Sequence, residues 1–296
     1  MEYNTIIIGG GVAGLTAGLY LGRANKTCLI LEGKFWGGQT ALLNKVDNYP
    51  ALAHVSGFDI SNALFNQVKA YPVEFANELV IIVCKESDCF KVVTNKKEYF
   101  SNNIIIATGA KTGLLGLDNE KKFVGRGLSY CATCDGNFFK NKKVALYGLG
   151  KSAIEDIKYL HNLVQKLYWI IPDKSLNKMI DEINGLDKLE VIYSSQISEL
   201  VGTDVLQSIN IYDKVNKKDF NLEVAGLFVS LGRQPDTSWL NIDVKKDKEG
   251  YIIVDKNCQT NYKGIFACGD ITSRKLKQIV TACSDGAIAG SYIVNN

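Results

Sequence analysis

The chain has 296 residues, of which 46% are hydrophobic and 22% charged, a composition typical of a globular protein with room for two domains. The formal net charge is only +3, so the sequence contains no basic half that would indicate nucleic-acid binding. No signal-peptide pattern and no run as long as a membrane span is present, and we therefore expect a cytoplasmic protein.

The first predicted elements are a strand at residues 5–8, a glycine-rich turn at 9–14 and a helix at 15–22. Further strands are predicted at 28–31 and 104–107. An apolar strand that runs into a glycine turn and a helix is the usual opening of a βαβ unit. We therefore predict a mainly parallel sheet covered by helices.

Three glycines in the first turn have the G-x-G-x-x-G spacing of a dinucleotide-binding turn. Gly9 permits the tight turn, Gly11 lets the backbone approach a pyrophosphate, and Gly14 lets the helix pack closely on the strand. Glu32 follows at the end of the second strand, where a carboxylate can accept hydrogen bonds from ribose hydroxyls. The alternative is a glycine-rich turn without a ligand.

Two later strand ends favour FAD over a nicotinamide at this turn. Residues 104–109, IIIATG, form an apolar strand that ends in small residues, as expected where a second crossing of the chain approaches a dinucleotide. Residues 264–271, GIFACGDI, place Asp270 after a strand and a glycine. From there its carboxylate could bind the ribityl chain or the region of the pyrophosphate.

Cys131 and Cys134 are spaced so that they can close a small disulfide ring, or hold one thiolate ready to attack a substrate disulfide. Asp135 follows directly and could exchange a proton with a cysteine sulfur. A zinc site needs about four ligands, but the sequence has no second cysteine pair, and its two histidines, His54 and His161, lie elsewhere. We expect no metal; zinc and an inert buried pair are the alternatives.

A second strand, glycine turn and helix are predicted at 144–147, 148–153 and 154–164, with further strands at 167–171, 226–230 and 251–254. Turn residues at 113–116 and 232–235 mark two domain crossings. We predict an α/β protein with two Rossmann-like three-layer domains of the FAD/NAD(P)-binding type, the second inserted into the first. The outer domain comprises 1–112 and 236–296, and the inserted domain comprises 113–235.

The chain resembles the low-molecular-weight thioredoxin reductases over nearly its whole length. The motifs that carry the resemblance are GGGVAGLTAGLY (9–20), GGQT (37–40), VDNYP (46–50), IIATGA (105–110), GRGLSYCATCDG (125–136), GYIIVD (250–255), GIFACGDI (264–271) and KQIVTACSDGAIA (277–289). The CATCDG segment after GRG-x-SY is highly specific for this family.

The resemblance implies an FAD site, a dithiol mechanism and a homodimer whose inserted domain swings relative to the FAD domain. In the dithiol, Cys134 would face the flavin, Cys131 would attack the disulfide of thioredoxin, and Asp135 would be the acid–base group. The implied FAD-binding residues are Gly9, Gly11, Val12, Ala13, Gly14, Glu32, Gly38, Gln39, Asn48, Ala107, Thr108, Gly109, Gly269, Asp270, Lys277, Gln278 and Ile279.

The inserted domain departs from the family at the site for the NADPH 2′-phosphate. Gly148, Gly150 and Ala153 keep a GxGxxA turn, but the family's histidine–arginine–arginine cluster and its later arginine are missing. The corresponding residues are Ile171, Pro172, Asp173 and Asn177, and Arg126 is the only arginine between residues 113 and 232. Without guanidinium groups to pair with the dianionic 2′-phosphate, we do not expect NADPH to bind productively.

In keeping the fold but lacking the phosphate-binding cations, the chain resembles the flavin thioredoxin reductases of anaerobic, clostridial-type bacteria. Those enzymes take electrons from reduced ferredoxin. We therefore expect electrons to pass from ferredoxin to FAD, to the Cys131–Cys134 pair and on to thioredoxin. The alternatives are a thioredoxin reductase that uses NADPH or NADH, a reductase of another small disulfide protein, and a flavin-bound redox sensor without turnover.

Overall fold

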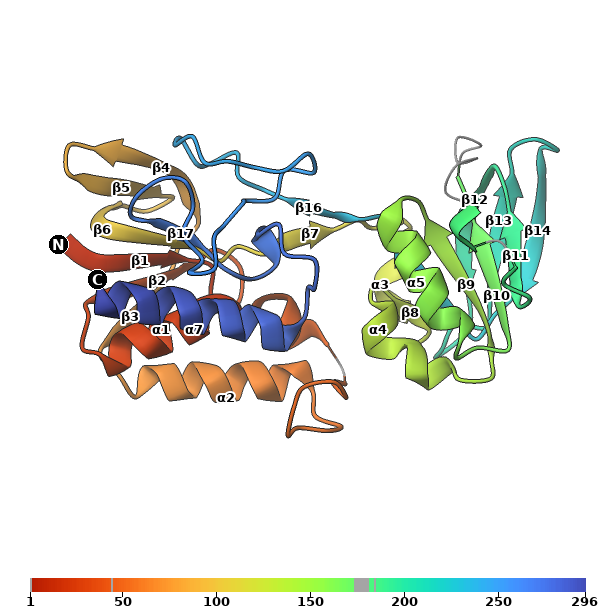
Figure 1. Ribbon diagram of the computed structural model, residues 1–296. Coiled ribbons are helices and arrows are strands. Elements are labelled where there is room, and N and C mark those ends of the chain that lie inside the picture. The colour runs from red at the N-terminus through yellow and green to blue at the C-terminus, as the bar shows by residue number, and fades with distance from the viewer. Residues whose placement is uncertain (1, 44, 173–180, 184) are drawn as a thin grey trace. The chain divides into compact units, whose positions relative to one another are not determined.

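A computed structural model describes residues 2–43, 45–172, 181–183 and 185–296 (Figure 1). The chain divides into two compact units, Met1–Lys111 with Gln234–Asn296, and Thr112–Arg233. The predicted crossings, after residues 112 and 235, lie within two residues of these bounds. Strands β7 (Ala110–Thr112) and β16 (Arg233–Pro235), one at each crossing, pair with each other.

The first unit is built on a seven-stranded sheet in the order β3-β2-β1-β6-β5-β4, with β17 also paired to β6. Its strands are β1 (Glu2–Ile8), β2 (Cys28–Glu32), β3 (Val73–Asn77), β4 (Val80–Glu86), β5 (Cys89–Thr94), β6 (Glu98–Ile106) and β17 (Ile265–Ala267). The pairs β3–β2, β2–β1, β1–β6 and β6–β17 are parallel. The pairs β6–β5 and β5–β4 are antiparallel. The parallel part carries the glycine turn.

Helices α1 (Val12–Arg23), α2 (Gly57–Lys69) and α7 (Ile279–Asn295) cover one face of this sheet (Figure 1). Ile7, Ile30 and Ile105 lie side by side in the register and pack against these helices. Their neighbours Ile6 and Ile104 point into a second core on the opposite face. Because both faces are buried, the central strands are continuous apolar runs instead of alternating ones.

The second unit has a parallel five-stranded sheet in the order β11-β10-β9-β15-β8. Its strands are β8 (Leu128–Ser129), β9 (Lys143–Gly148), β10 (Lys166–Ile170), β11 (Leu189–Ile192) and β15 (Gly226–Ser230). Helix α5 (Lys151–His161) packs on one face. The antiparallel sheet of β12 (Ser195–Val201), β13 (Ser208–Asp213) and β14 (Lys218–Glu223) packs on the other through β12 and β13. Short helices α3 (Glu120–Phe123) and α4 (Ala132–Asp135) complete this unit.

The predicted fold class is confirmed, and the predicted strands at 5–8, 28–31 and 226–230 lie within β1, β2 and β15. The predicted strand at 251–254 is wrong. Ile252 alone forms isolated bridges, to Lys246 on one side and Thr272 on the other. Gly250, with φ of 90°, and the turn that follows Asp255 limit the pairing to this single residue.

We predict that Gly286→Ala destabilises the first unit. A Cβ at Gly286 of α7 would lie 2.2 Å from the Ala13 carbonyl oxygen of α1, so the helices would have to separate. Alanine is the better helix former by about 1 kcal/mol, but overpacking of a core costs roughly 1–3 kcal/mol. Thermal unfolding should therefore show a lower midpoint than for the wild type. The exposed Ser284→Ala on the same helix is the control, and equal midpoints for both variants would contradict the prediction.

Candidate functional site

The glycine turn between β1 and α1 is closely packed at two points and open at a third. Gly9 has φ of +109°, and a Cβ there would lie 2.4 Å from the Ala107 carbonyl oxygen. A Cβ on Gly14 would lie 2.0 Å from the Gly9 carbonyl oxygen. A Cβ on Gly11, by contrast, would meet no described atom nearer than the Cα of Gly38, at 4.0 Å. The middle glycine therefore leaves space over the start of α1.

Polar groups suited to a dinucleotide surround this space. Glu32, at the end of β2, accepts the Gly10 N–H at 2.7 Å with one carboxylate oxygen and the Lys34 N–H at 2.8 Å with the other. Each oxygen retains a lone pair for a hydroxyl donor. No described side chain caps the start of α1, and its first turn holds no acidic residue. The N–H groups there are therefore available to an anion.

Segments that are far apart in sequence meet beside the same turn. The Gln39 side-chain amide donates a hydrogen bond to the Ala110 carbonyl. Gly109 has φ of +67°, and a Cβ there would lie 4.0 Å from the nitrogen of this Gln39 amide. The Asn48 side chain donates to the Gln278 side-chain oxygen at 2.9 Å. Four segments that carry predicted FAD-binding residues are therefore linked in two pairs.

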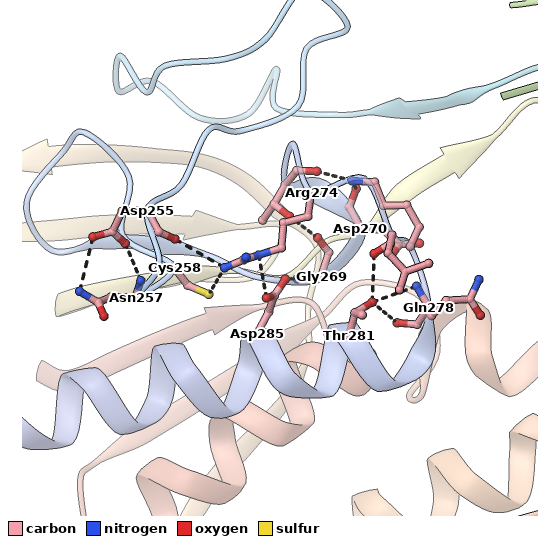
Figure 2. Close-up of polar contacts among 12 residues, drawn as sticks. Asp255, Asn257, Cys258, Gly269, Asp270, Arg274, Gln278, Thr281 and Asp285 are labelled. Carbon is pink, nitrogen blue, oxygen red and sulfur yellow. Dashed lines mark hydrogen bonds and ion pairs between the residues drawn. The ribbon is translucent and has the colours of Figure 1, made fainter. Parts of the chain in front are cut away.

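The loop that carries Asp270 is anchored to α7 (Figure 2). Asp285 of α7 accepts the Gly269 N–H at 3.2 Å with one oxygen, and the other oxygen forms a 2.8 Å ion pair with Arg274 Nε. Burial raises the pKa of Asp285, and the charge of Arg274 opposes this shift. Lys277 Nζ donates to the Asp270 carbonyl at 3.1 Å. Sequence reasoning missed Arg274 and Asp285, because no motif spacing links them.

Cys131 and Cys134 form a disulfide in the second unit. Cys131 stands at the N-cap of α4, where its sulfur accepts the Cys134 N–H at 3.2 Å. The Asp135 N–H donates to the Cys131 carbonyl at 3.1 Å. The Ser129 hydroxyl donates to the Asp135 carboxylate at 2.6 Å. The two sulfurs, the carboxylate and this hydroxyl therefore form one local cluster, of which sequence reasoning missed Ser129.

The second glycine turn, between β9 and α5, has a different surrounding. A Cβ on Gly148 would lie 2.0 Å from the Ser230 carbonyl oxygen, whereas one on Gly150 would meet no described atom within 4 Å. Trp169 of β10 is fully buried, and its indole N–H donates to the Gly148 carbonyl at 3.0 Å. The buried Trp169 side chain therefore fixes the backbone of Gly148, the first glycine of this turn.

The described residues after β10 are apolar at positions where the family has cations. Ile171 is fully buried, and Pro172 is partly exposed. Asp173 and Asn177 lie outside the described residues. Tyr147, which precedes the turn, is also buried. The described residues at the end of β10 thus offer no guanidinium to a phosphate.

The predicted FAD-binding residues belong to the first unit, and the dithiol belongs to the second. Across the described ranges, His, Cys, Asp and Glu side chains do not gather in any group of three that could hold a metal ion. None of the helices in the described part of the chain has the length and apolar character needed to cross a membrane.

Comparisons with known proteins agree over nearly the whole chain. A family model described as pyridine nucleotide-disulphide oxidoreductase matches residues 3–286. Thioredoxin reductases of Treponema pallidum and Listeria monocytogenes are 35% and 37% identical to this chain, covering 99% and 97% of it and 97% and 92% of their own lengths. The solved thioredoxin reductase of Streptococcus pyogenes is 34% identical, with a TM-score of 0.93 over 99% of this chain and 97% of that one.

We predict that Asp156→Asn on α5 stabilises the second unit at neutral pH. Burial raises the pKa of Asp156 to about 6, and the Ser230 hydroxyl only partly opposes this shift. A carboxyl with a raised folded pKa stabilises the fold below its unfolded pKa, and that contribution disappears as the pH rises through about 6. The variant should gain about 1–2 kcal/mol at pH 7 and little at pH 4.

Urea unfolding at both pH values, followed by circular dichroism and tryptophan fluorescence, measures this difference. The exposed Asp204→Asn, in the loop between β12 and β13 of the same unit, is the matched control and should show no such pH dependence. A gain for Asp156→Asn that is equal at both pH values would contradict the prediction.

Proposed function

The chain belongs to the pyridine nucleotide-disulphide oxidoreductase family, among its thioredoxin reductases, and from this premise we propose that reduced ferredoxin is its electron donor. Electrons would pass by way of FAD to the Cys131–Cys134 disulfide and then to thioredoxin. By the same resemblance we infer that the protein acts as a homodimer.

The first unit offers a site that fits FAD. The open face of Gly11, the uncapped start of α1 in the described chain and the Glu32 carboxylate match the needs of a pyrophosphate and a ribose. Gln39, Asn48 and Gln278 would contact the remainder of the cofactor. Bound FAD supplies a carrier that can accept electrons singly and deliver them in pairs.

The end of β10 carries the proposal for the donor. Binding of a 2′-phosphate calls for arginine side chains in a planar, bidentate arrangement. At the positions where the family has this cluster, Ile171 is fully buried and Pro172 has no cationic group. A donor that delivers electrons without occupying the second glycine turn agrees with these residues, and ferredoxin is such a donor.

The cysteines of the second unit perform the exchange with thioredoxin. The reduced Cys131 thiolate attacks one sulfur of the thioredoxin disulfide, and the departing thiolate of thioredoxin takes up a proton. Cys134 then attacks the Cys131 sulfur of the mixed disulfide, which restores the Cys131–Cys134 bond and releases the second thiol. Two electrons and two protons have then moved to thioredoxin. Asp135, adjacent to Cys134, is the proposed group that exchanges protons with the sulfurs.

A pyridine nucleotide is the second candidate donor. The turn from Gly148 to Ala153 keeps its GxGxxA spacing, and no described atom lies within 4 Å of where a Cβ would stand on Gly150 or Gly232. Space for a dinucleotide backbone therefore persists even though the cationic cluster is missing. NADH, which has no 2′-phosphate, suits such a site better than NADPH.

We predict that reduced ferredoxin reduces the bound flavin and supports formation of the dithiol, whereas NADPH and NADH do not. Stopped-flow absorbance of the holoenzyme measures flavin bleaching by each donor, and dithionite serves as the control that the flavin can be reduced. Bleaching by either nucleotide at a rate that supports turnover would overturn the ferredoxin proposal. It would leave the proposed dithiol chemistry intact.

We predict that the two cysteines respond differently to substitution. Cys134→Ser keeps the attacking sulfur and removes the resolving one, so it should accumulate a mixed disulfide with thioredoxin. Cys131→Ser should form none and should lose at least about 1,000-fold of its turnover, because a hydroxyl is a poor nucleophile at neutral pH. Non-reducing electrophoresis and mass spectrometry detect the adduct.

Cys89→Ser, in the β-hairpin of the first unit, is the matched control and should retain wild-type turnover. Both single variants of the dithiol should keep their flavin. An adduct with Cys131→Ser and none with Cys134→Ser would reverse the proposed roles.

A further inference from the structure

Ser129 occupies a fixed position next to the dithiol. It is only 4% exposed and ends strand β8, where it pairs with Phe228 of β15. Its hydroxyl donates to the Asp135 carboxylate at 2.6 Å and accepts the Cys131 N–H at 3.0 Å. One buried oxygen therefore contacts both the proposed acid–base residue and the backbone of the proposed nucleophile.

We propose that Ser129 is a positioning residue that holds the Asp135 carboxylate during proton transfer to and from the dithiol. This inference rests on the proposed role of Asp135. Ser129 acts through Asp135, since in the described chain its hydroxyl bonds to the Asp135 carboxylate and to backbone atoms of Cys131, and not to a sulfur.

A hydroxyl suits this task because it can serve both protonation states of the carboxyl group. While Asp135 is ionised, the hydroxyl proton points to the carboxylate, and a bond to a charged acceptor is the stronger one. Once Asp135 has taken a proton from a sulfur, the carboxyl group can become the donor to Ser129. The hydroxyl proton can then turn to the Cys131 carbonyl, which lies 3.3 Å away. Neither state leaves a buried polar group without a partner.

The neighbouring side chain of Tyr130 is held in its neutral form. Tyr130, the next residue, donates its hydroxyl to Glu120 at 2.6 Å, and burial together with this bond raises the pKa of Tyr130. Glu120 in turn accepts the backbone N–H groups of Leu115 and Gly116. Tyr130 therefore stays neutral over the working range and does not contribute to the pH dependence expected of Asp135 and the two cysteines.

The test is the pH dependence of thioredoxin reduction by holoenzyme that has been reduced chemically in advance, in a single turnover. This assay needs neither ferredoxin nor a nucleotide. Ser129→Ala removes the donor to the carboxylate, which disfavours its ionised form. It should slow the exchange about tenfold at neutral pH and shift the acidic limb of the profile to higher pH. Ser129→Thr keeps the hydroxyl and should keep the wild-type profile.

Two further variants separate positioning from a general structural effect. In an Asp135→Asn background, Ser129→Ala should slow the exchange less than about twofold, since the two changes remove one interaction. Ser208→Ala removes another buried, hydrogen-bonded serine of the same unit and should leave rate and profile unchanged. An unshifted profile for Ser129→Ala, or a full tenfold loss in the Asp135→Asn background, would overturn the proposal.

The outcome also distinguishes this inference from the proposed function. If Asp135→Asn leaves rate and pH profile unchanged, the acid–base role of Asp135 fails, and the role of Ser129 fails with it. If Asp135→Asn alters the profile and Ser129→Ala does not, only the role of Ser129 is overturned.

Discussion

Close backbone contact around a glycine turn constrains both units. At Gly14, in α1, a Cβ would lie 2.0 Å from the Gly9 carbonyl oxygen, and at Gly148, which ends β9, it would lie 2.0 Å from the Ser230 carbonyl oxygen of the neighbouring strand β15. Only glycine allows the backbone to approach this closely at either position. The helix N-terminus is then fixed at the carboxyl end of the sheet. Loops that leave neighbouring parallel strands begin at the same edge of the sheet. Glu32 at the end of β2, Gly109 after β6 and Asp270 after β17 therefore all lie at that edge.

The two glycine turns differ in the groups that surround them. In both, a Cβ on the middle glycine would meet no described atom nearer than 4.0 Å. In the first unit, Asp285 and Arg274 hold the loop after β17. In the second, Trp169 donates to the Gly148 carbonyl and Ile171 is buried at the next strand end. If the second unit no longer recognises a nucleotide, as we propose, these contacts would preserve the fold of its glycine turn.

The sequence predicted elements whose periodicity is local and failed where pairing depends on the rest of the fold. The strands of the two glycine turns were predictable, because apolar runs of buried parallel strands are continuous. The stretch at 251–254 has the same composition, but only Ile252 pairs, between two turns. The contacts of Asp285 with Arg274 and of Ser129 with Asp135 could not be predicted from the sequence, for a related reason. A polar contact depends on side-chain direction in the folded chain, and no spacing rule encodes it.

The proposed reduction of the flavin by its donor and the proposed reduction of thioredoxin by the dithiol involve different residues. The disulfide, Asp135 and Ser129 all lie within the second unit, so the geometry of thiol exchange is set by β8, α4 and their local hydrogen bonds. Ile171 and Pro172, where our proposal places the loss of phosphate-binding cations, lie at the end of β10, in another part of that unit's sheet. A change of donor could therefore arise through replacements near Ile171 without disturbing the dithiol. The chemistry at Cys131 then remains that of the family, whichever donor reduces the flavin.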